Sequence, residues 1–150
     1  MHSSSMTSLQ QFQQLLQTRI LIIDGATGTM FQKYHKTGRF ILDEATFRGE
    51  RFKDHPKDLK GNNDLLCLTC PEAVEAVHHA FLEAGADIIE TNTFSSTSIA
   101  QEDYELAHIA YELNLVAAQI ARKAADAYST PEKPRFVAGS IGPTSKALSI

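Results

Sequence analysis

The chain has 150 residues, with 14 lysines and arginines against 18 aspartates and glutamates, so its formal net charge is −4. This acidic balance argues against a protein dedicated to nucleic acid or to anionic membranes, because both classes carry a basic footprint. No apolar run approaches the roughly 18 to 20 residues of a membrane span, no signal peptide is visible, and two cysteines exclude a disulfide scaffold. We therefore expect a cytoplasmic protein with no nucleic-acid or membrane partner.

The first predicted element is a short amphipathic helix over 8–18, where apolar residues recur at helical spacing. Four consecutive aliphatic residues over 20–23, followed by Asp24-Gly25, predict a strand buried on both faces. Residues 26–64 show no sustained period. A connection of this length is usually functional or wraps the fold, and the alternative is a mobile insertion.

The clearest helix is predicted over 69–84, where Thr69 and Glu72 have the spacing of a capping box and Pro71 lies in the first turn. A second strand is predicted over 86–94, and its C-terminal end becomes polar.

A second long helix is predicted over 104–128 from apolar residues at three- and four-residue spacing, and a third strand over 135–143. Strands that alternate with helices are typical of βαβ units and a parallel sheet, so the fold class is α/β. Two architectures remain open: a doubly wound sheet and a (β/α)₈ barrel. Because the barrel needs about 250 residues, three strands would form only its first part.

Polar or glycine-rich residues follow each predicted strand, over 24–29, 90–93 and 139–144. In both architectures ligands bind at this edge of the sheet, so we expect these segments to share a site. Asp24 could cap the following turn or hold a cationic group such as a substrate amine. Gly25 and Gly28 permit either a close backbone approach to a ligand or a turn with positive φ.

The second strand end supplies the remaining polar candidates. Glu90 is either a ligand carboxylate or a paired structural acid, and Thr91 and Asn92 offer hydroxyl and amide groups for hydrogen bonding. Neither a dinucleotide motif nor a phosphate-binding loop is present in this sequence.

Cys67-Leu68-Thr69-Cys70 has the C-x-x-C spacing, but one such pair supplies only two of the four ligands of a structural zinc. A redox pair stays open as an alternative, because residues 65–68 could form a short strand before the helix. We interpret Cys67 instead as a buried apolar residue and Cys70 as a helix-start residue. His78 and His79 are neighbours on a helix and cannot both face one metal, so we place them at the surface or at the edge of the core.

Several long segments carry a family resemblance. They are ILIIDGATGTM, FRGERF, LKGNNDLL, GADIIETNTFSSTSIA and FVAGSIGPTSKALSI. In this order they resemble the start of the cobalamin-dependent methionine synthases, over roughly residues 19–150. On this basis residues 1–18 are a tail with a short helix, and residues 19–150 are the N-terminal portion of a homocysteine-binding domain.

The resemblance implies a (β/α)₈ TIM barrel, incomplete in this chain. It implies methionine biosynthesis by transfer of a methyl group from 5-methyltetrahydrofolate, through cobalamin, to homocysteine. In the family, zinc holds the homocysteine sulfur as a thiolate, which is the nucleophilic form of a thiol. The three zinc cysteines lie beyond Ile150 in the family order, and neither Cys67 nor Cys70 matches them. We therefore expect no metal ligand, no catalytic residue and no methyl-transfer activity in this chain alone.

The resemblance also assigns substrate-facing residues. Asp24 would accept a hydrogen bond from the α-ammonium of homocysteine, with Gly25 allowing a close approach, and Thr91 would contact the same end beside Glu90 and Asn92. Residues expected to shape the surrounding loops are Gly28, Thr29, Gly142, Pro143 and Thr144.

One position departs from the family pattern. The family usually reads DGGMGT where this chain has DGATGT, so Ala26 replaces a glycine. If the backbone there required positive φ, alanine would cost about 1 kcal/mol of strain.

Two other functions remain open. The first is a stand-alone homocysteine S-methyltransferase with the same barrel that uses betaine or S-methylmethionine. The second is a non-catalytic half-barrel that only binds a ligand. Unpaired edge strands argue against the second alternative, because such edges promote self-association.

Overall fold

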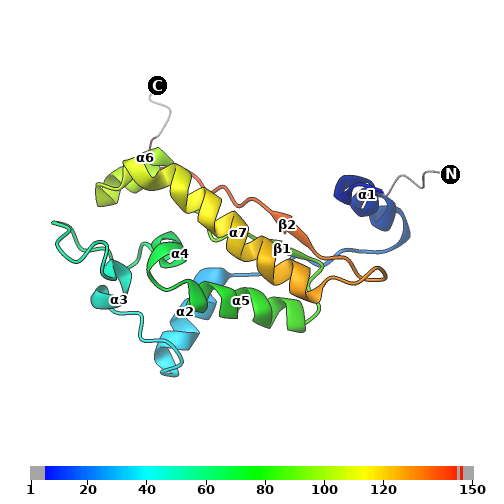
Figure 1. Ribbon diagram of the computed structural model, residues 1–150, viewed down its shortest axis with the longest axis horizontal. Helices are drawn as coiled ribbons and strands as arrows, with labels where there is room; N and C mark the ends of the chain where they lie inside the picture. Colours follow the sequence, from blue (N-terminus) through cyan, green and yellow to red (C-terminus); the bar gives the residue numbers. More distant parts are fainter. Residues whose placement is uncertain (1–5, 145, 147–150) are drawn as a thin grey trace.

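The computed structural model describes residues 6–144 and 146. Its sheet is built from parallel segments (Figure 1). Strands β1 (Ile88–Glu90) and β2 (Phe136–Ala138) pair in parallel, with Ile88 opposite Phe136. The extended segment 20–24 joins the other side of β1 through a parallel bridge between Ile23 and Ile88. The prediction of a parallel α/β arrangement is confirmed, although the described residues do not close a barrel.

Helices connect and cover these segments. They are α1 (Ser8–Thr18), α2 (Thr27–Lys36), α3 (Glu44–Arg48), α4 (Leu66–Thr69), α5 (Pro71–Glu83), α6 (Ser98–Gln101) and α7 (Ala110–Tyr128), with 3₁₀ turns at Asn63–Leu65, Glu102–Tyr104 and Ala107–Ile109. Helices α5 and α7 run side by side along the sheet (Figure 1). Ile89 of β1 packs with Leu82 and Ala121 in a small core cluster between them. No helix of the described chain is long and apolar enough to span a membrane.

The start of α5 differs from the predicted capping box. The residue before the helix is Cys70, whose side chain does not cap it, and Pro71 is the first helical residue. Thr69 belongs to the preceding turn α4, where its hydroxyl donates to the carbonyl of Leu65. The capping prediction is wrong because the chain is already helical before Pro71.

The long helix α7 begins six residues later than the sequence predicts, at Ala110. Glu105 has a left-handed conformation with φ of 57°, which interrupts the helical path and leaves two 3₁₀ turns in its place. The apolar residues Leu106, Ile109 and Leu113 are nevertheless all buried. The periodicity located the buried face correctly and the helix start incorrectly.

The segment 26–64 wraps the fold and contains α2 and α3, which the sequence did not predict. One ion pair organises its irregular part. The carboxylate of Glu44 contacts Nε of Arg48 at 2.6 Å and accepts hydrogen bonds from the amides of Leu59 and Lys60 at 2.9 and 2.7 Å. The Arg48 guanidinium donates to the carbonyl of Lys57 at 2.9 Å. These contacts favour a connection that wraps the fold over a mobile insertion.

The segment 20–23 is less buried than its sequence predicts. Ile20, Ile22 and Ile23 are 84%, 55% and 52% exposed. The prediction of burial on both faces is wrong because the described residues leave these side chains largely uncovered on the faces of the sheet. The segment also pairs on one side only, with β1.

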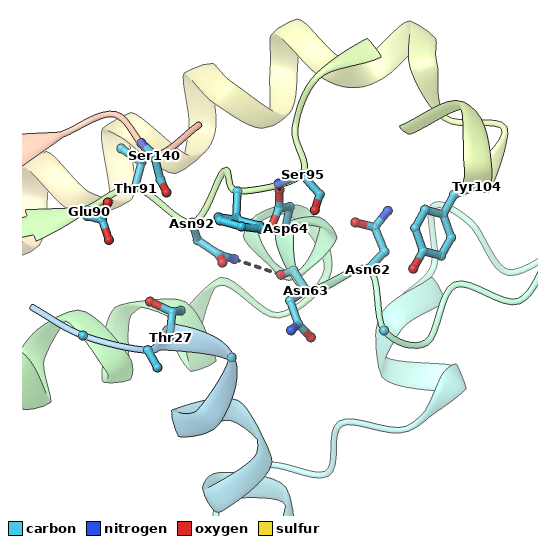
Figure 2. A pocket seen from close by; sticks show the side chains of 15 residues that line it. Thr27, Asn62, Asn63, Asp64, Glu90, Thr91, Asn92, Ser95, Tyr104 and Ser140 are labelled. Atoms are coloured by element: carbon cyan, nitrogen blue, oxygen red, sulfur yellow. Dashed lines mark hydrogen bonds between the residues drawn. The ribbon is translucent and has the colours of Figure 1, made fainter. Parts of the chain in front are cut away.

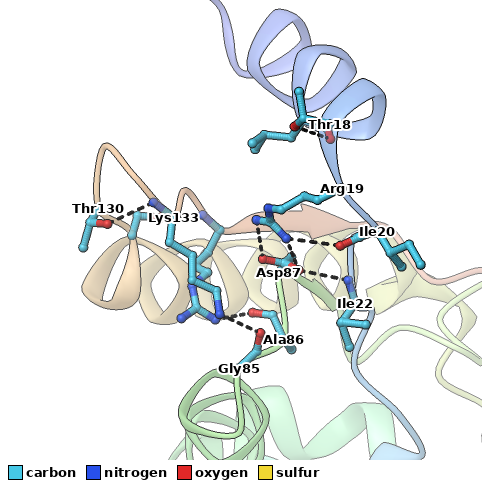
Figure 3. Close-up of polar contacts among 12 residues, drawn as sticks. Thr18, Arg19, Ile20, Ile22, Gly85, Ala86, Asp87, Thr130 and Lys133 are labelled. Carbon is cyan, nitrogen blue, oxygen red and sulfur yellow. Dashed lines mark hydrogen bonds and ion pairs between the residues drawn. The ribbon is translucent and has the colours of Figure 1, made fainter.

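A partly buried ion pair fixes the start of this segment (Figure 3). The Arg19 guanidinium meets the carboxylate of Asp87 through two hydrogen bonds of 2.8 and 2.9 Å, and the same carboxylate accepts from the amide of Ile22. The Arg19 guanidinium lowers the pKa of Asp87. Because Asp87 directly precedes β1, the pair sets the register between the two neighbouring segments.

His78 of α5 is fully buried, and neither ring nitrogen has a hydrogen-bond partner among the described residues. This corrects the expectation of a surface or edge position. The reason is that His78 lies one helical turn after Val74, which is also fully buried. Burial lowers the pKa of His78 to about 4.

We expect His78 to make the fold acid-sensitive. Its pKa is lower in the folded than in the unfolded chain, so its contribution is complete above pH 6.5 and is lost as the pH falls towards 4. Replacing His78 with leucine should therefore stabilise the protein at pH 4.5 by about 2.5 kcal/mol more than at pH 7.5. Urea unfolding at both pH values measures this difference. The exposed His108→Leu variant is the control, and an equal effect of both substitutions would contradict the expectation.

Candidate ligand site at the strand ends

A cavity of about 390 Å³ opens where the parallel segments end (Figure 2). Its lining comes from 25–28, 61–64, the last residue of β1 and the chain that follows it, Tyr104 and Ser140. The structure thus brings the three polar strand ends together at one cavity, and adds a wall from the irregular connection before α4.

One wall of the cavity is the N-terminus of α2. Ala26 precedes this ten-residue helix and provides no side-chain cap. The first backbone amides of a helix have no partner within it, and the helix dipole adds a partial positive charge there. Thr27 and Gly28 of this first turn line the cavity. This wall therefore offers hydrogen-bond donors to an anionic group.

The loop before α2 carries no strain from the missing glycine. Ala26 has φ of −64°, which is an ordinary value for alanine. Gly25 and Gly28 do not have positive φ either. The strain that the family comparison would assign to Ala26 is therefore absent.

The opposite wall is acidic. Glu90 lines the cavity, and Asp24 lies beside it, because Oδ2 of Asp24 accepts a hydrogen bond from the Glu90 amide at 3.0 Å. The other oxygen of Asp24, Oδ1, is buried with no partner among the described residues. Burial raises the pKa of Asp24 to about 6, and the Glu90 carboxylate adds to this rise. A partly buried carboxylate with one unpartnered oxygen is costly, and a cation bound beside it would offset that cost.

Asp64 contributes a buried carboxylate on the far wall. Its Oδ2 accepts hydrogen bonds from the amide of Ser95 at 2.7 Å and the hydroxyl of Ser96 at 2.8 Å. Burial raises the pKa of Asp64. In the described part of the chain, no lysine, arginine or histidine lines this cavity.

Side-chain amides hold the far wall in place. Asn62 and Gln101 exchange two hydrogen bonds of 2.8 and 3.1 Å, and both residues are buried. The amide of Asn92 donates to the carbonyl of Asn63 at 2.8 Å, as Figure 2 shows. Asn92 therefore joins the end of β1 to the wrapping connection. Its side-chain NH2 group is used in this hydrogen bond within the protein.

The sequence model of the homocysteine S-methyltransferases matches residues 21–150. The chain belongs to the homocysteine S-methyltransferase family. Among solved structures, it is similar to the crystal structure of the homocysteine methyltransferase MmuM from Escherichia coli in its metallated form, with a TM-score of 0.63 and 23% identity. The match covers 88% of this chain and 41% of MmuM, so the chain spans less than half the length of that enzyme. At this identity the likeness shows the shared fold.

Of the loop-shaping residues predicted for this family member, only Gly28 lines the cavity. Thr29 is exposed on α2 and does not line it, and Pro143 and Thr144 are exposed as well. The amide of Gly142 donates to the carbonyl of Phe94 at 2.9 Å. A Cβ at position 142 would collide with that carbonyl, so this close approach requires glycine.

The wrapping connection and the chain after β1 supply lining residues that the sequence prediction missed. They are Gly61, Asn62, Asn63, Asp64, Phe94, Ser95 and Tyr104. The polar run directly before the apolar Leu65-Leu66 is the signal that could have indicated the first four.

The described residues of this family member do not fit a metal ion. No group of three or more histidines, cysteines, aspartates or glutamates among them has a metal-binding arrangement. Cys67 and Cys70 are free and buried, and burial raises the pKa of their thiols to about 12 and 11. Thiols held in this way stay protonated at neutral pH, which makes them poor metal ligands and poor nucleophiles.

Proposed function

We propose that this chain is the homocysteine-binding portion of an enzyme that methylates homocysteine to methionine. The observation that carries the proposal is the polarity of the cavity, which has helix amides on one wall and carboxylates on the other. A free amino acid has the complementary polarity, with an α-carboxylate and an α-ammonium.

In the proposed complex, the α-carboxylate of homocysteine accepts hydrogen bonds from the first amides of α2, near Gly25 and Thr27. Its α-ammonium lies at Asp24 and Glu90, where it supplies the cation that the Asp24 oxygen lacks. Thr91 lies at the same end, and the side chain of the substrate extends along the apolar surfaces of Phe94 and Tyr104.

We further propose that the methyl group comes from 5-methyltetrahydrofolate through cobalamin, as the resemblance over residues 19–150 to the methionine synthases implies. In this proposal residues 19–150 are the N-terminal portion of a (β/α)₈ barrel. Zinc activation of the homocysteine sulfur would depend on residues outside the described part, because no metal site fits within it. The two free cysteines are consistent with a reducing, cytoplasmic setting.

The similarity to MmuM supports a second candidate, a stand-alone homocysteine S-methyltransferase that takes its methyl group from betaine or S-methylmethionine. The two candidates share the homocysteine site and differ only in the donor. A methyl-transfer assay of the parent enzyme with methylcobalamin, betaine and S-methylmethionine in separate reactions distinguishes them.

Calorimetric titration of the chain tests the homocysteine site directly. Homocysteine and methionine should bind. N-acetylhomocysteine lacks the cation and 3-aminopropanethiol lacks the carboxylate, so each should bind at least about 30-fold more weakly, the effect of losing one charged hydrogen-bonded group. We expect no methyl transfer by the chain alone, even with zinc. Equal binding of the two truncated compounds and homocysteine would contradict the proposed recognition.

A further inference from the structure

We propose that a closed ring of hydroxyl hydrogen bonds, made by Thr91, Thr93 and the backbone of Ser140, positions the wall of the cavity between the ends of β1 and β2. Thr91 and Thr93 are 8% and 4% exposed. The amide of Ser140 contacts Oγ1 of Thr91 at 3.0 Å, the two threonine hydroxyls are 2.6 Å apart, and Oγ1 of Thr93 is 2.8 Å from the Ser140 carbonyl oxygen.

The direction of every bond in this ring is fixed. The Ser140 carbonyl can only accept, so the hydroxyl of Thr93 must donate to it. Thr93 has no second proton, so the hydroxyl of Thr91 donates to Thr93 and accepts from the Ser140 amide. Each threonine hydroxyl therefore donates its single proton to a hydrogen bond within the ring.

The ring continues the sheet where the backbone ladder stops. The β1–β2 pairing ends with Glu90 opposite Ala138, and the amide of Thr91 donates to the Ala138 carbonyl. Beyond that point the ring replaces backbone pairing. Thr91 and Ser140, which both line the cavity, lie next to one another there (Figure 2).

The fixed proton direction determines what Thr91 can offer a ligand. Because its proton is committed to Thr93, the Thr91 hydroxyl can only accept a further hydrogen bond. This end of the cavity is lined by Glu90 and Thr91, with Asp24 hydrogen-bonded to the Glu90 amide beside them, so it presents acceptors and suits an ammonium group. This part of the inference rests on the proposed homocysteine site, whereas the ring itself does not.

Hydrogen exchange of the Ser140 amide tests the ring without any ligand. In Thr91→Val the Ser140 amide loses its acceptor, and its protection should fall by about tenfold. In Thr93→Val the Thr91 hydroxyl loses its own acceptor and the protection should fall by less, whereas Thr93→Ser should retain it. Ser140→Ala is the matched control, because Ser140 enters the ring through its backbone alone. Thr93→Ala serves as a second variant if valine prevents folding. Unchanged protection in a folded, ring-broken variant would overturn the ring.

Homocysteine titration of the same variants tests the positioning role. Thr93 does not line the cavity, yet the Kd of Thr93→Val should rise about fivefold and return to the wild-type value in Thr93→Ser. If protection of the Ser140 amide falls and the Kd for homocysteine is unchanged, the ring stabilises the fold only and the positioning role is wrong. If the wild-type chain does not bind homocysteine, the proposed function fails, while the exchange result still decides whether the ring exists.

Discussion

Replacing Asp24 with asparagine should stabilise the fold at pH 7 and weaken homocysteine binding at the same time. The Asp24 carboxylate is partly buried, one of its oxygens has no partner among the described residues, and its pKa is raised to about 6. Holding it ionised therefore costs folding free energy at neutral pH. Asparagine keeps an oxygen for the Glu90 amide and removes the charge. We expect a gain of about 2 kcal/mol in the free energy of unfolding, and a Kd for homocysteine at least about 30-fold higher.

The stability difference between Asp24→Asn and the wild type should depend on pH. The folded chain binds the Asp24 proton more tightly than the unfolded chain does, so the wild type recovers stability as the pH falls from about 6 towards 3.8. The advantage of the Asp24→Asn variant should therefore be largest at pH 7 and should disappear near pH 4. Urea unfolding of both proteins across this range measures the difference in their free energies of unfolding. Because both proteins contain His78, its contribution cancels in that difference.

Asp54→Asn is the matched control, because Asp54 is exposed in the wrapping connection. It should change neither the stability nor the affinity. An Asp24→Asn variant that is less stable than the wild type at pH 7 would contradict the expectation, and would indicate that the charge is compensated within the fold.

The second large effect is self-association of the isolated chain through the segment 20–23. Ile20 and Ile22 are 84% and 55% exposed on a segment that pairs on one side only. Exposed apolar residues on an unpaired edge favour pairing with another copy. Replacing Ile20 and Ile22 together with lysine should raise the dissociation constant of self-association by at least about tenfold, since edge lysines block strand pairing.

Sedimentation velocity over a range of protein concentrations measures this effect. Tyr111→Lys is a matched control, because Tyr111 is 81% exposed on α7 and lies away from the sheet edge. A wild-type chain that stays monomeric at every concentration, with a sharp cooperative melting transition, would show that the edge is inert.

Elements with a strong apolar period could be predicted from the sequence, and their ends could not. The helix over 8–18 is confirmed as α1, and the buried face of α7 follows the predicted spacing. The start of α7 was misplaced because a single left-handed residue, Glu105, decides it. Helix α2 was missed because its sequence, TGTMFQKYHK, has a weak period and only Phe31 and Tyr34 are buried.

Part of the candidate site could likewise be predicted from the sequence, and part could not. The strand ends were found because polar residues after apolar runs indicate the ligand-binding edge of a parallel sheet, and Glu90 and Thr91 do line the cavity. Asn62 and Asp64 were missed because their place depends on Gln101 and Ser96, residues more than thirty positions away. Such contacts arise from tertiary structure and leave no local pattern. Family membership, in contrast, was carried by long motifs and is confirmed at the level of the homocysteine S-methyltransferases.

The Glu44–Arg48 pair also bears on the order of events during folding. The Glu44 carboxylate closes loops of only 15 and 16 residues when it meets the amides of Leu59 and Lys60. The β1–β2 pairing instead joins Ile88 to Phe136 across the whole of α7, and contacts between distant residues form more slowly than local ones. The part of the wrapping connection over 44–60 can therefore form before the strands pair. The cavity-lining residues Asn62 and Asp64 reach their final places only when Gln101 and Ser96 pack against them.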